Sequence, residues 1–268
     1  MQIRAFQHTW HGVRLHDLTN GEGATPAGPD VYKRLYQTLA DGKSLPDQTW
    51  STKKRALGEF ISVEIFKGWE ARNLCSPRIL ALCAGKCAAE RVWLEQNYNV
   101  TIHEYQTVSL QDVRTEFPNV PVLIGDVREL SIEETFDIVV LLAGEYFLDR
   151  RELETVLRKV AVRLSHDGLF VMQSVSALSL TQSLKELIKK FSRRYRSSAY
   201  VFWGYWRTPS EFSKSARRAG LQMNAQYSMD FVQERLVIRR NPRMLVAWPS
   251  LYLNAALMIF EHLSRASR

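Results

Sequence analysis

Residues 78–90, which read RILALCAGKCAAE, have the types and spacing needed to bind a nucleotide. The apolar residues 79–82 predict a strand that ends in a loop of small residues around Gly85. The apolar residues of 88–94 then recur at helical spacing. A strand, a tight turn and a helix bring backbone N–H groups and a helix N-terminus to one place, where they bind the polar part of a nucleotide.

The segments that follow predict the sheet that positions this loop. Apolar runs at 100–104, 120–124, 136–142 and 169–172 predict four further strands, and residues 153–164 predict an amphipathic helix. The run at 136–142 is almost wholly apolar, as expected for a strand that is covered on both faces. Strands that alternate with helices indicate an α/β fold with a doubly wound, mostly parallel sheet.

Two helices are predicted ahead of the first strand. Residues 31–39 predict a short helix, and residues 51–72 predict a longer one from apolar residues at three-to-four spacing. Lys53, Lys54 and Arg55 lie in the first turns of the longer helix. This basic group either covers the nucleotide site or forms a solvated charged face.

The last third of the chain predicts one helix, two strands and a helical tail. Thr208 and Pro209 predict a helix start, with Thr208 as the N-cap and Pro209 at the first helical position. Residues 221–230 and 231–239 predict an antiparallel pair of strands at the sheet edge. We expect residues 241–268 to form a C-terminal amphipathic helix.

Length and charge narrow the class of protein. The 268 residues suffice for one large α/β domain at 51–240, with an N-terminal arm at 1–50. A net charge of +8 favours anionic partners. Three cysteines are too few for a disulfide framework and indicate a reducing, cytoplasmic location. We expect no secretory signal, no good membrane span and no metal site.

Taken in order, these segments resemble the class I S-adenosylmethionine-dependent methyltransferases, over roughly residues 60–240. The resemblance rests on the glycine-rich first motif at 79–87, the acidic Glu104 after the second strand, and the segments 124–127, 136–140, 164–170, 208–212 and 219–221. It implies a Rossmann-like, doubly wound sheet of seven strands, mostly parallel with an antiparallel last strand, plus N- and C-terminal helical additions.

The resemblance also implies that S-adenosyl-L-methionine is the cofactor. Glu104 is then expected to accept hydrogen bonds from both ribose hydroxyls. Asp126 is expected to accept from the adenine amino group, beside the backbone N–H of Val127. The other implied cofactor-binding residues are Leu82, Cys83, Ala84, Gly85, Tyr105, Gly125 and Leu142.

The first motif departs from the family pattern at three positions. Ala81 stands where the family has an acidic residue, and Cys83 and Cys87 stand where it has glycines. Cysteine is small, so we expect the loop to form. The missing carboxylate weakens any prediction about how the methionine amino group is bound.

Glu145 and Tyr146 are the candidate catalytic residues, because the segment after the fourth strand lines the gap between donor and acceptor in the family. The sulfonium is already reactive, so positioning supplies most of the help, and an oxygen nucleophile still needs a base. The alternative for these two residues is an N-cap region and a packed aromatic ring.

Residues 175–207 form a basic and aromatic insertion that we expect to bind the acceptor. Cations suit phosphate, and aromatic faces suit sugars and bases. We expect an anionic small molecule, such as a hydroxyl of a nucleotide- or lipid-linked sugar in polysaccharide biosynthesis. RNA also fits, DNA is not expected, and a solvated helix face is the plain alternative. The candidate substrate-binding residues are Arg193, Arg194, Tyr195, Trp203 and Tyr205.

Two further alternatives stay open. Cys83, Gly85 and Ala88 have the spacing of a dinucleotide fingerprint, which would indicate an NAD-dependent oxidoreductase. A methyltransferase fold retained as a non-catalytic binding subunit also explains the altered first motif. The tail either contacts the inner face of a membrane peripherally or packs on the main domain or a homodimer partner.

Overall fold

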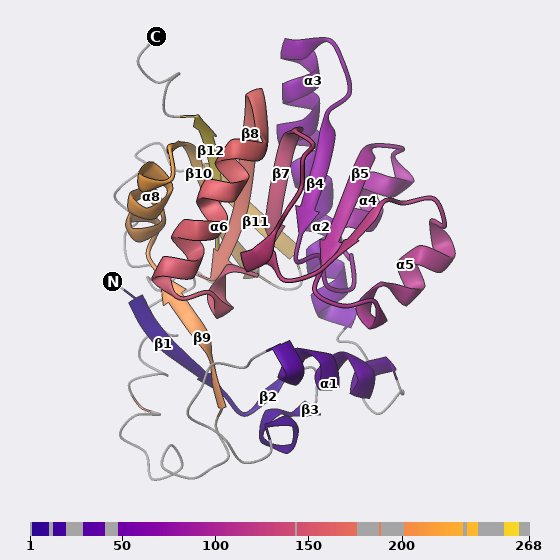
Figure 1. Ribbon diagram of the computed structural model, residues 1–268, viewed down its shortest axis with the longest axis vertical. Helices are drawn as coiled ribbons and strands as arrows, with labels where there is room; N and C mark the ends of the chain where they lie inside the picture. Colours follow the sequence, from indigo (N-terminus) through magenta and orange to yellow (C-terminus); the bar gives the residue numbers. More distant parts are fainter. Residues whose placement is uncertain are drawn as a thin grey trace.

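The structure is a computed structural model that describes residues 2–10, 13–19, 29–40, 48–142, 144–175, 188, 201–232, 235–240 and 255–262. Its centre is an eight-stranded sheet with the order β11-β10-β12-β8-β7-β4-β5-β6 (Figure 1). The parallel strands are β4 (Arg78–Leu82), β5 (Asn99–Glu104), β6 (Val122–Ile124), β7 (Phe136–Leu142) and β8 (Leu164–Val175). The antiparallel pairings add β10 (Leu221–Val232), β11 (Arg235–Arg240) and β12 (Ala255–His262).

The strand order places a switch point next to β4. The chain runs outward from β4 through β5 to β6, then returns to the other side of β4 for β7 and β8. In open α/β sheets, ligands bind outside the carboxyl ends of the strands at such a point. A ligand is therefore expected at the loops after β4, β5 and β7.

One face of the sheet is covered by a long helical segment and two short helices. The segment runs through α2 (Gln48–Ile61), a π-helical turn (Ser62–Phe66) and α3 (Lys67–Asn73), which confirms the helix predicted at 51–72. Its buried apolar residues pack with α4 (Glu90–Glu95) and α5 (Gln111–Glu116) in one cluster.

Capped helices cover the opposite face. Asp149 and Glu152 form a capping box at the start of α6 (Arg150–Arg163). Thr208 caps α8 (Pro209–Arg218), with Pro209 at its start as predicted. Both helices bury their apolar sides in a second cluster with β7, β8 and β12.

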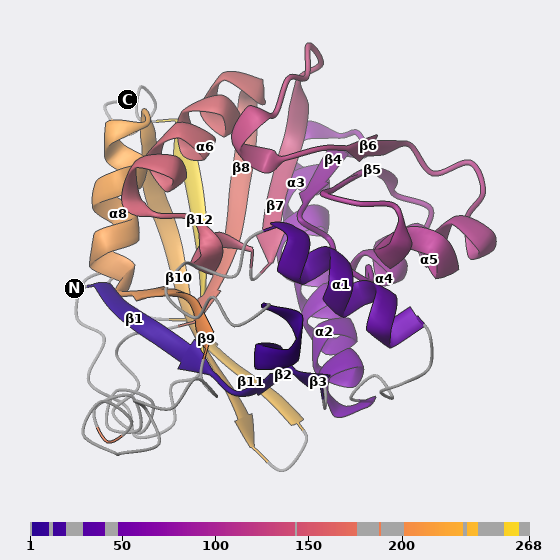
Figure 2. The same cartoon turned by 60° about the horizontal axis from the view of Figure 1, so that its bottom comes forward.

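The N-terminal residues form a small unit at the carboxyl end of the parallel strands. β1 (Gln2–Gln7) pairs antiparallel with β9 (Val201–Arg207), and β2 (Thr9–Trp10) pairs with β3 (Val13–Arg14). η1 (Leu15–Leu18) and α1 (Pro29–Ala40) complete the unit, which has its own apolar cluster. α1 lies across the lower end of the sheet in Figure 1 and in front of it in Figure 2.

Short 3-10 helices follow three of the parallel strands at this end. They are η3 (Val108–Leu110) after β5, η4 (Val127–Glu129) after β6 and η5 (Glu145–Phe147) after β7. Among the helices that the structure describes, none is long and apolar enough to cross a membrane.

The tail differs from its prediction. Within the predicted C-terminal helix, residues 255–262 form the strand β12, which inserts between β8 and β10 and raises the strand count from seven to eight. Leu257 and Ile259 lie in one apolar cluster, and Met258 and Phe260 lie in the other. Since residues 256–260 are all buried against one face or the other, the apolar run has no helical or strand periodicity that identifies it.

The position of β12 predicts a large effect of Phe260→Ala. Phe260 is 0% exposed and stacks on Phe170 of β8 at 5.7 Å between ring centroids. We expect a loss of about 3–5 kcal/mol in the free energy of unfolding, measured with urea, because the change leaves a cavity between the sheet and the helices α6 and α8. Val162→Ala, at an exposed position of α6, is the control with a change within about 0.5 kcal/mol. Equal effects of the two variants would contradict the central placement of β12.

Candidate functional site

The loop after β4 holds an unusual backbone conformation. Cys83, Gly85 and Cys87 have φ angles of 53°, 59° and 55°, in the left-handed region. Glycine adopts this region without steric cost, whereas a residue with a Cβ is strained there by about 1–2 kcal/mol. These are the positions at which the family pattern has glycines, so the two cysteines keep the loop conformation at an energetic cost.

Glu104 ties this loop to the end of β5. Its Oε2 accepts a hydrogen bond from the backbone N–H of Gly85 at 2.7 Å, and the N–H of Ala84 donates to the carbonyl of His103 at 3.2 Å. The Glu104 side chain is buried. Burial raises the pKa of its carboxyl group, and the N–H groups of Gly85 and Tyr105 oppose that shift.

The segment after β6 lies next to Glu104, and its own carboxylate, that of Asp126, is hydrogen-bonded within the segment. The N–H of Gly125 donates to the carbonyl of Glu104 at 3.0 Å. Asp126 caps η4 and accepts from the backbone N–H of Arg128 at 2.8 Å and from its guanidinium at 2.6 Å. These bonds lower the pKa of Asp126. Arg128 also pairs with Glu152 at 2.9 Å, so it joins this segment to α6.

The segment after β7 is held in place from two sides. A Cβ on Gly144 would lie 2.8 Å from the Cβ of Cys83, so this segment packs directly on the first loop. On its other side, the buried guanidinium of Arg207 donates to the carbonyl oxygens of Glu145, at 3.2 Å, and of Leu148. The two candidate catalytic residues therefore begin a segment with little room to move.

Aromatic rings gather where η5 meets the N-terminal unit. Tyr146 stacks on Trp203 with 5.9 Å between ring centroids and 19° between the rings. Tyr32 of α1 and Trp10 of β2 also contact Trp203, each at 5.3 Å. Together these four residues form an aromatic cluster beside Glu145.

A bulge in β9 explains why Trp203 reaches this cluster and Tyr205 does not. Ala5 pairs with Gly204 and Phe6 pairs with Phe202, so Trp203 is the extra residue. A bulge re-aims side chains by breaking the two-residue alternation of a strand. Tyr205 packs instead against Phe202 at 5.2 Å and lies 5.2 Å from the Arg207 guanidinium.

Helix α1 lies over the loop that follows β4. A Cβ on Gly85 would lie 2.9 Å from the hydroxyl oxygen of Tyr36. Burial and the nearby carboxylate of Glu104 raise the pKa of Tyr36 well above its usual value. Tyr32 and Tyr36 are four residues apart and share one face of the helix, which aims both rings at the site.

The structure brings most of the predicted site residues to this edge of the sheet. Those that meet around the loops are Leu82, Cys83, Ala84, Gly85, Glu104, Gly125, Asp126, Val127, Leu142, Glu145, Tyr146 and Trp203. Tyr105 is 39% exposed, and Tyr205 lies on the other side of β9. The predicted residues Arg193, Arg194 and Tyr195 lie outside the described residues.

Sequence reasoning missed several residues of the site. Tyr32, Tyr36 and Arg207 come from segments far apart in the chain and reach the site through tertiary packing. Lys54 belongs to the basic group that the sequence predicts either to cover the nucleotide site or to form a solvated face; its ammonium lies at the carboxyl edge of the sheet, 2.6 Å from Oε1 of Gln173. The four-residue spacing of the two tyrosines was the available signal for α1.

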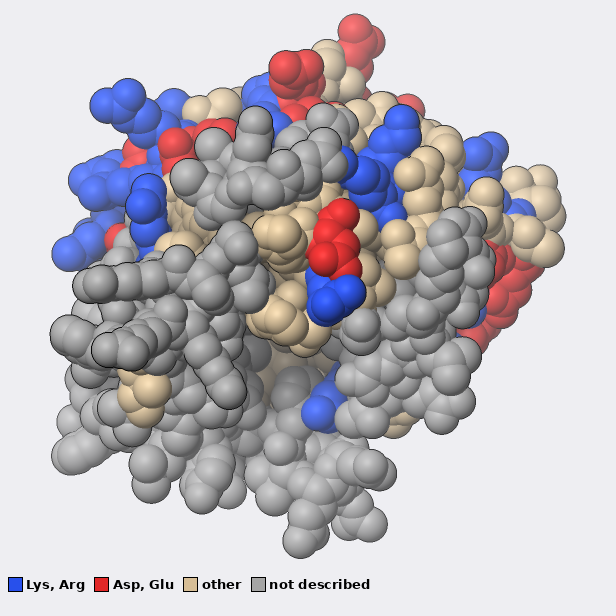
Figure 3. Space-filling view, turned by 90° about the horizontal axis from the view of Figure 1, so that it is seen from below, with Lys and Arg blue, Asp and Glu red and all other residues tan. Residues whose placement is uncertain are grey.

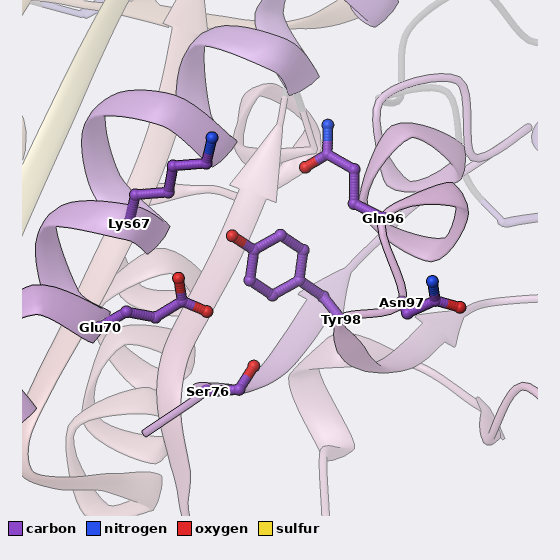
Figure 4. Close-up of a pocket in the computed structure, with 6 residues that line it drawn as sticks. All are labelled: Lys67, Glu70, Ser76, Gln96, Asn97 and Tyr98. Atoms are coloured by element: carbon purple, nitrogen blue, oxygen red, sulfur yellow. The ribbon is translucent and has the colours of Figure 1, made fainter. Parts of the chain in front are cut away.

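A surface hollow lies elsewhere on the molecule. Figure 4 shows it between α3 and the segment that joins α4 to β5, with the Tyr98 hydroxyl directed into it and Lys67 and Glu70 on one side. This volume of about 400 Å³ is at the amino end of the parallel strands. It is therefore separate from the loops that carry the site.

Seen from below, an acidic and a basic side chain lie side by side near the centre of the described surface, above a hollow, with uncharged residues next to them (Figure 3). Within the described ranges, no group of three or more His, Cys, Asp or Glu side chains is arranged to hold a metal ion.

The close approach of β9 to η5 predicts opposite effects of two Gly→Ala changes. A Cβ on Gly204 would lie 2.3 Å from the carbonyl oxygen of Tyr146, so Gly204→Ala should lower the free energy of unfolding by about 1–3 kcal/mol. Gly68 in α3 has open space, so Gly68→Ala should raise it by about 0.5–1 kcal/mol. Urea unfolding measures both values; a neutral Gly204→Ala would contradict the contact.

Burial of His103 predicts acid sensitivity. Its Nδ1 has no hydrogen-bond partner in the described part of the chain, and burial lowers its pKa from 6.5 to about 4. The unfolded chain binds this proton first, so the native state loses stability as the pH falls from 6.5 through 4. By pH 4.5 the loss should reach about 2–3 kcal/mol.

Unfolding by urea at pH 7 and pH 4.5 tests this assignment. In His103→Gln the loss between the two pH values should shrink by that amount. The exposed His166 provides the control, since His166→Gln should keep the pH dependence of the wild type. Parallel curves for wild type and His103→Gln would overturn the assignment.

Known proteins resemble this chain in fold and not in sequence. No protein-family model matches the chain, and no curated protein matches it in sequence. Its fold is similar to the CcbJ methyltransferase from Streptomyces caelestis, at 14% identity and a TM-score of 0.53, covering 79% of this chain and 89% of that one. An S-adenosylmethionine-dependent methyltransferase from Clostridium acetobutylicum is 12% identical with a TM-score of 0.55, covering 86% of this chain and 97% of that one.

Two further solved structures of methyltransferases are similar to this chain in fold. The mitomycin 7-O-methyltransferase MmcR is 13% identical with a TM-score of 0.57, covering 94% of this chain and 61% of that one. The glycopeptide N-methyltransferase MtfA, solved with S-adenosyl-L-methionine, is 16% identical with a TM-score of 0.50, covering 72% and 86%. With its strand order and its loop after β4, this chain has the class I S-adenosylmethionine-dependent methyltransferase fold.

Proposed function

We propose that this protein is a S-adenosylmethionine-dependent methyltransferase that acts on a small-molecule acceptor. The observation that carries the proposal is the buried carboxylate of Glu104, held at 2.7 Å by the Gly85 N–H at the switch point of the sheet. Its two oxygens match the two hydroxyls of a ribose. Methyltransferases that share the fold support the same cofactor.

The charges of the site suit this cofactor. Glu90, Glu104 and Glu145 are buried carboxyl groups at one edge of the sheet. Buried carboxylates stabilise a nearby cation. When bound, S-adenosylmethionine supplies a methyl group on a positively charged sulfonium, so an acidic surround favours its binding.

Glu145 is the better candidate for the general base. Burial raises the pKa of Tyr146 well above the usual value for tyrosine, so its hydroxyl keeps its proton at neutral pH. A protonated hydroxyl donates a hydrogen bond and cannot accept the acceptor's proton. We therefore give Glu145 the role of base and Tyr146 the role of orienting the acceptor.

The aromatic cluster supports a ring-shaped acceptor. Trp203 is itself buried, and the partly buried rings of Tyr146, Tyr32 and Trp10 pack around it beside Glu145. The flat apolar faces of such partly buried rings bind sugar rings and planar rings by stacking. The proposed acceptor is a hydroxyl group of a nucleotide- or lipid-linked sugar in polysaccharide biosynthesis, with the basic residues of the insertion at 175–207 supplying cations for its phosphates.

A non-catalytic binding subunit is the second candidate. Two observations favour it: Arg128 occupies the carboxylate of Asp126, and Tyr36 packs against Gly85. Both contacts lie where the proposed cofactor would bind. Cofactor binding to the purified protein distinguishes the two candidates.

Calorimetric titration with S-adenosylhomocysteine, with NAD as the comparison ligand, tests the proposal. We expect micromolar binding of the first and none of the second. Glu104→Ala should weaken binding about 10- to 100-fold, because two charge-assisted hydrogen bonds are lost. Asp126→Ala should weaken it less, about tenfold or under, since Arg128 already holds that carboxylate.

Glu64→Ala, at an exposed position of the π-helical turn, is the matched control and should leave the affinity unchanged. Unchanged affinity in Glu104→Ala would contradict the assigned site. Binding of neither ligand by the wild-type protein would favour the non-catalytic subunit.

A further inference from the structure

Lys54 reaches the carboxyl edge of the sheet from α2. Its Nζ donates to Oε1 of Gln173 at 2.6 Å and lies 3.5 Å from the carbonyl oxygen of Leu142. These two partners lie near the carboxyl ends of β8 and β7. The ammonium group therefore spans the two strands that lie on the far side of β4 from Glu104.

Two buried carboxyl groups act on this ammonium through their charges. Burial lowers the pKa of Lys54 to about 8, and the charges of Glu90 and Glu145 oppose that shift. Burial also raises the pKa of Glu90 to about 7, while its backbone hydrogen bond and Lys54 oppose the rise. The packing of α2 on the start of α4 places Lys54 near Glu90: a Cβ on Gly58, one turn after Lys54, would lie 2.6 Å from the carbonyl oxygen of Ala89.

This charge pattern is complementary to an α-amino acid. A free amino acid carries one carboxylate and one ammonium group a few bonds apart. The Lys54 ammonium and the Glu90 carboxyl, which interact through their charges, offer one partner for each.

The order of groups along the edge gives the direction of the ligand. If the ribose lies on Glu104 and the adenine near Asp126, the remaining part of the cofactor extends across the loop after β4 and away from β6. It then arrives at Leu142, Gln173 and Lys54. The order along the edge is Gln173 with Lys54, Leu142, the loop at 83–85, Glu104 and Asp126.

We propose that Lys54 binds the carboxylate of the methionine end of the cofactor and that Glu90 faces its ammonium group. This inference rests on the proposed function. It also explains how the chain binds this end although Ala81 stands where the family pattern has an acidic residue: the missing carboxylate of β4 is replaced by Glu90 at the start of α4.

Two ligands that share the adenosine and sulfur but differ in the amino acid end test the inference. S-adenosylhomocysteine carries the amino acid end, and 5′-methylthioadenosine lacks it. Both are titrated calorimetrically into the full-length wild type, Lys54→Met and Lys54→Arg. Lys67→Met is the matched control, because Lys67 is exposed on the same helical segment, about 20 Å further along at 1.5 Å per residue.

We expect Lys54→Met to weaken S-adenosylhomocysteine binding about 10- to 100-fold, as for the loss of one charge-assisted hydrogen bond, and 5′-methylthioadenosine binding less than about threefold. Lys54→Arg should recover part of the lost affinity, because it keeps the charge, and Lys67→Met should match the wild type. Retained binding of 5′-methylthioadenosine also shows that the variant is folded.

Three results would overturn the inference. Unchanged S-adenosylhomocysteine affinity in Lys54→Met would show that Lys54 does not bind the cofactor's carboxylate, and it would leave the proposed function standing. Equal loss of both ligands shows that Lys54 supports the pocket as a whole. Failure of the wild type to bind either ligand removes both the proposed function and the inference that rests on it.

Discussion

The site depends on one hydrogen bond between a buried carboxylate and a backbone N–H. Glu104 ends β5, and its bond to Gly85 fixes the left-handed loop after β4 against the neighbouring strand. A carboxylate removed from water is stable only when such donors are present, so the loop and the acid stabilise each other. The segments after β6 and β7 then pack on this pair, through Gly125 and Gly144.

Close backbone approach is the second physical constraint. Gly144 and Gly204 each lie where a Cβ would enter a neighbouring segment, one against Cys83 and one against Tyr146. These contacts place η5 between the loop after β4 and β9. Arg207 then closes the segment by donating to two of its carbonyl groups. The candidate base is thus held by backbone packing as well as by side chains.

The site combines an acidic lining with an aromatic wall. Three buried carboxyls and one lysine lie along the strand ends, and the rings of Trp203 and its neighbours lie beyond them. The first set suits a cationic cofactor with an amino acid end. The second suits the ring of the proposed acceptor, so the two parts of the site offer different chemistry to the two proposed ligands.

The amino-acid sequence by itself determined the parallel half of the sheet and the groups at its strand ends. Runs such as 136–142 are apolar throughout, and Glu104 and Asp126 follow such runs directly, so local pattern was sufficient. The same reasoning fixed the start of α8 at Thr208, because an N-cap is a local hydrogen bond.

Tertiary structure alone decided that the tail forms a strand, that Trp203 joins the aromatic cluster and that Lys54 points toward the strand ends. The segment of β12 is buried on both faces, so its sequence has no period that separates strand from helix. The direction of Trp203 depends on a bulge that exists only when β9 pairs with β1. Lys54 could have faced solvent or the sheet, and only the packing of α2 against the strand ends settled which.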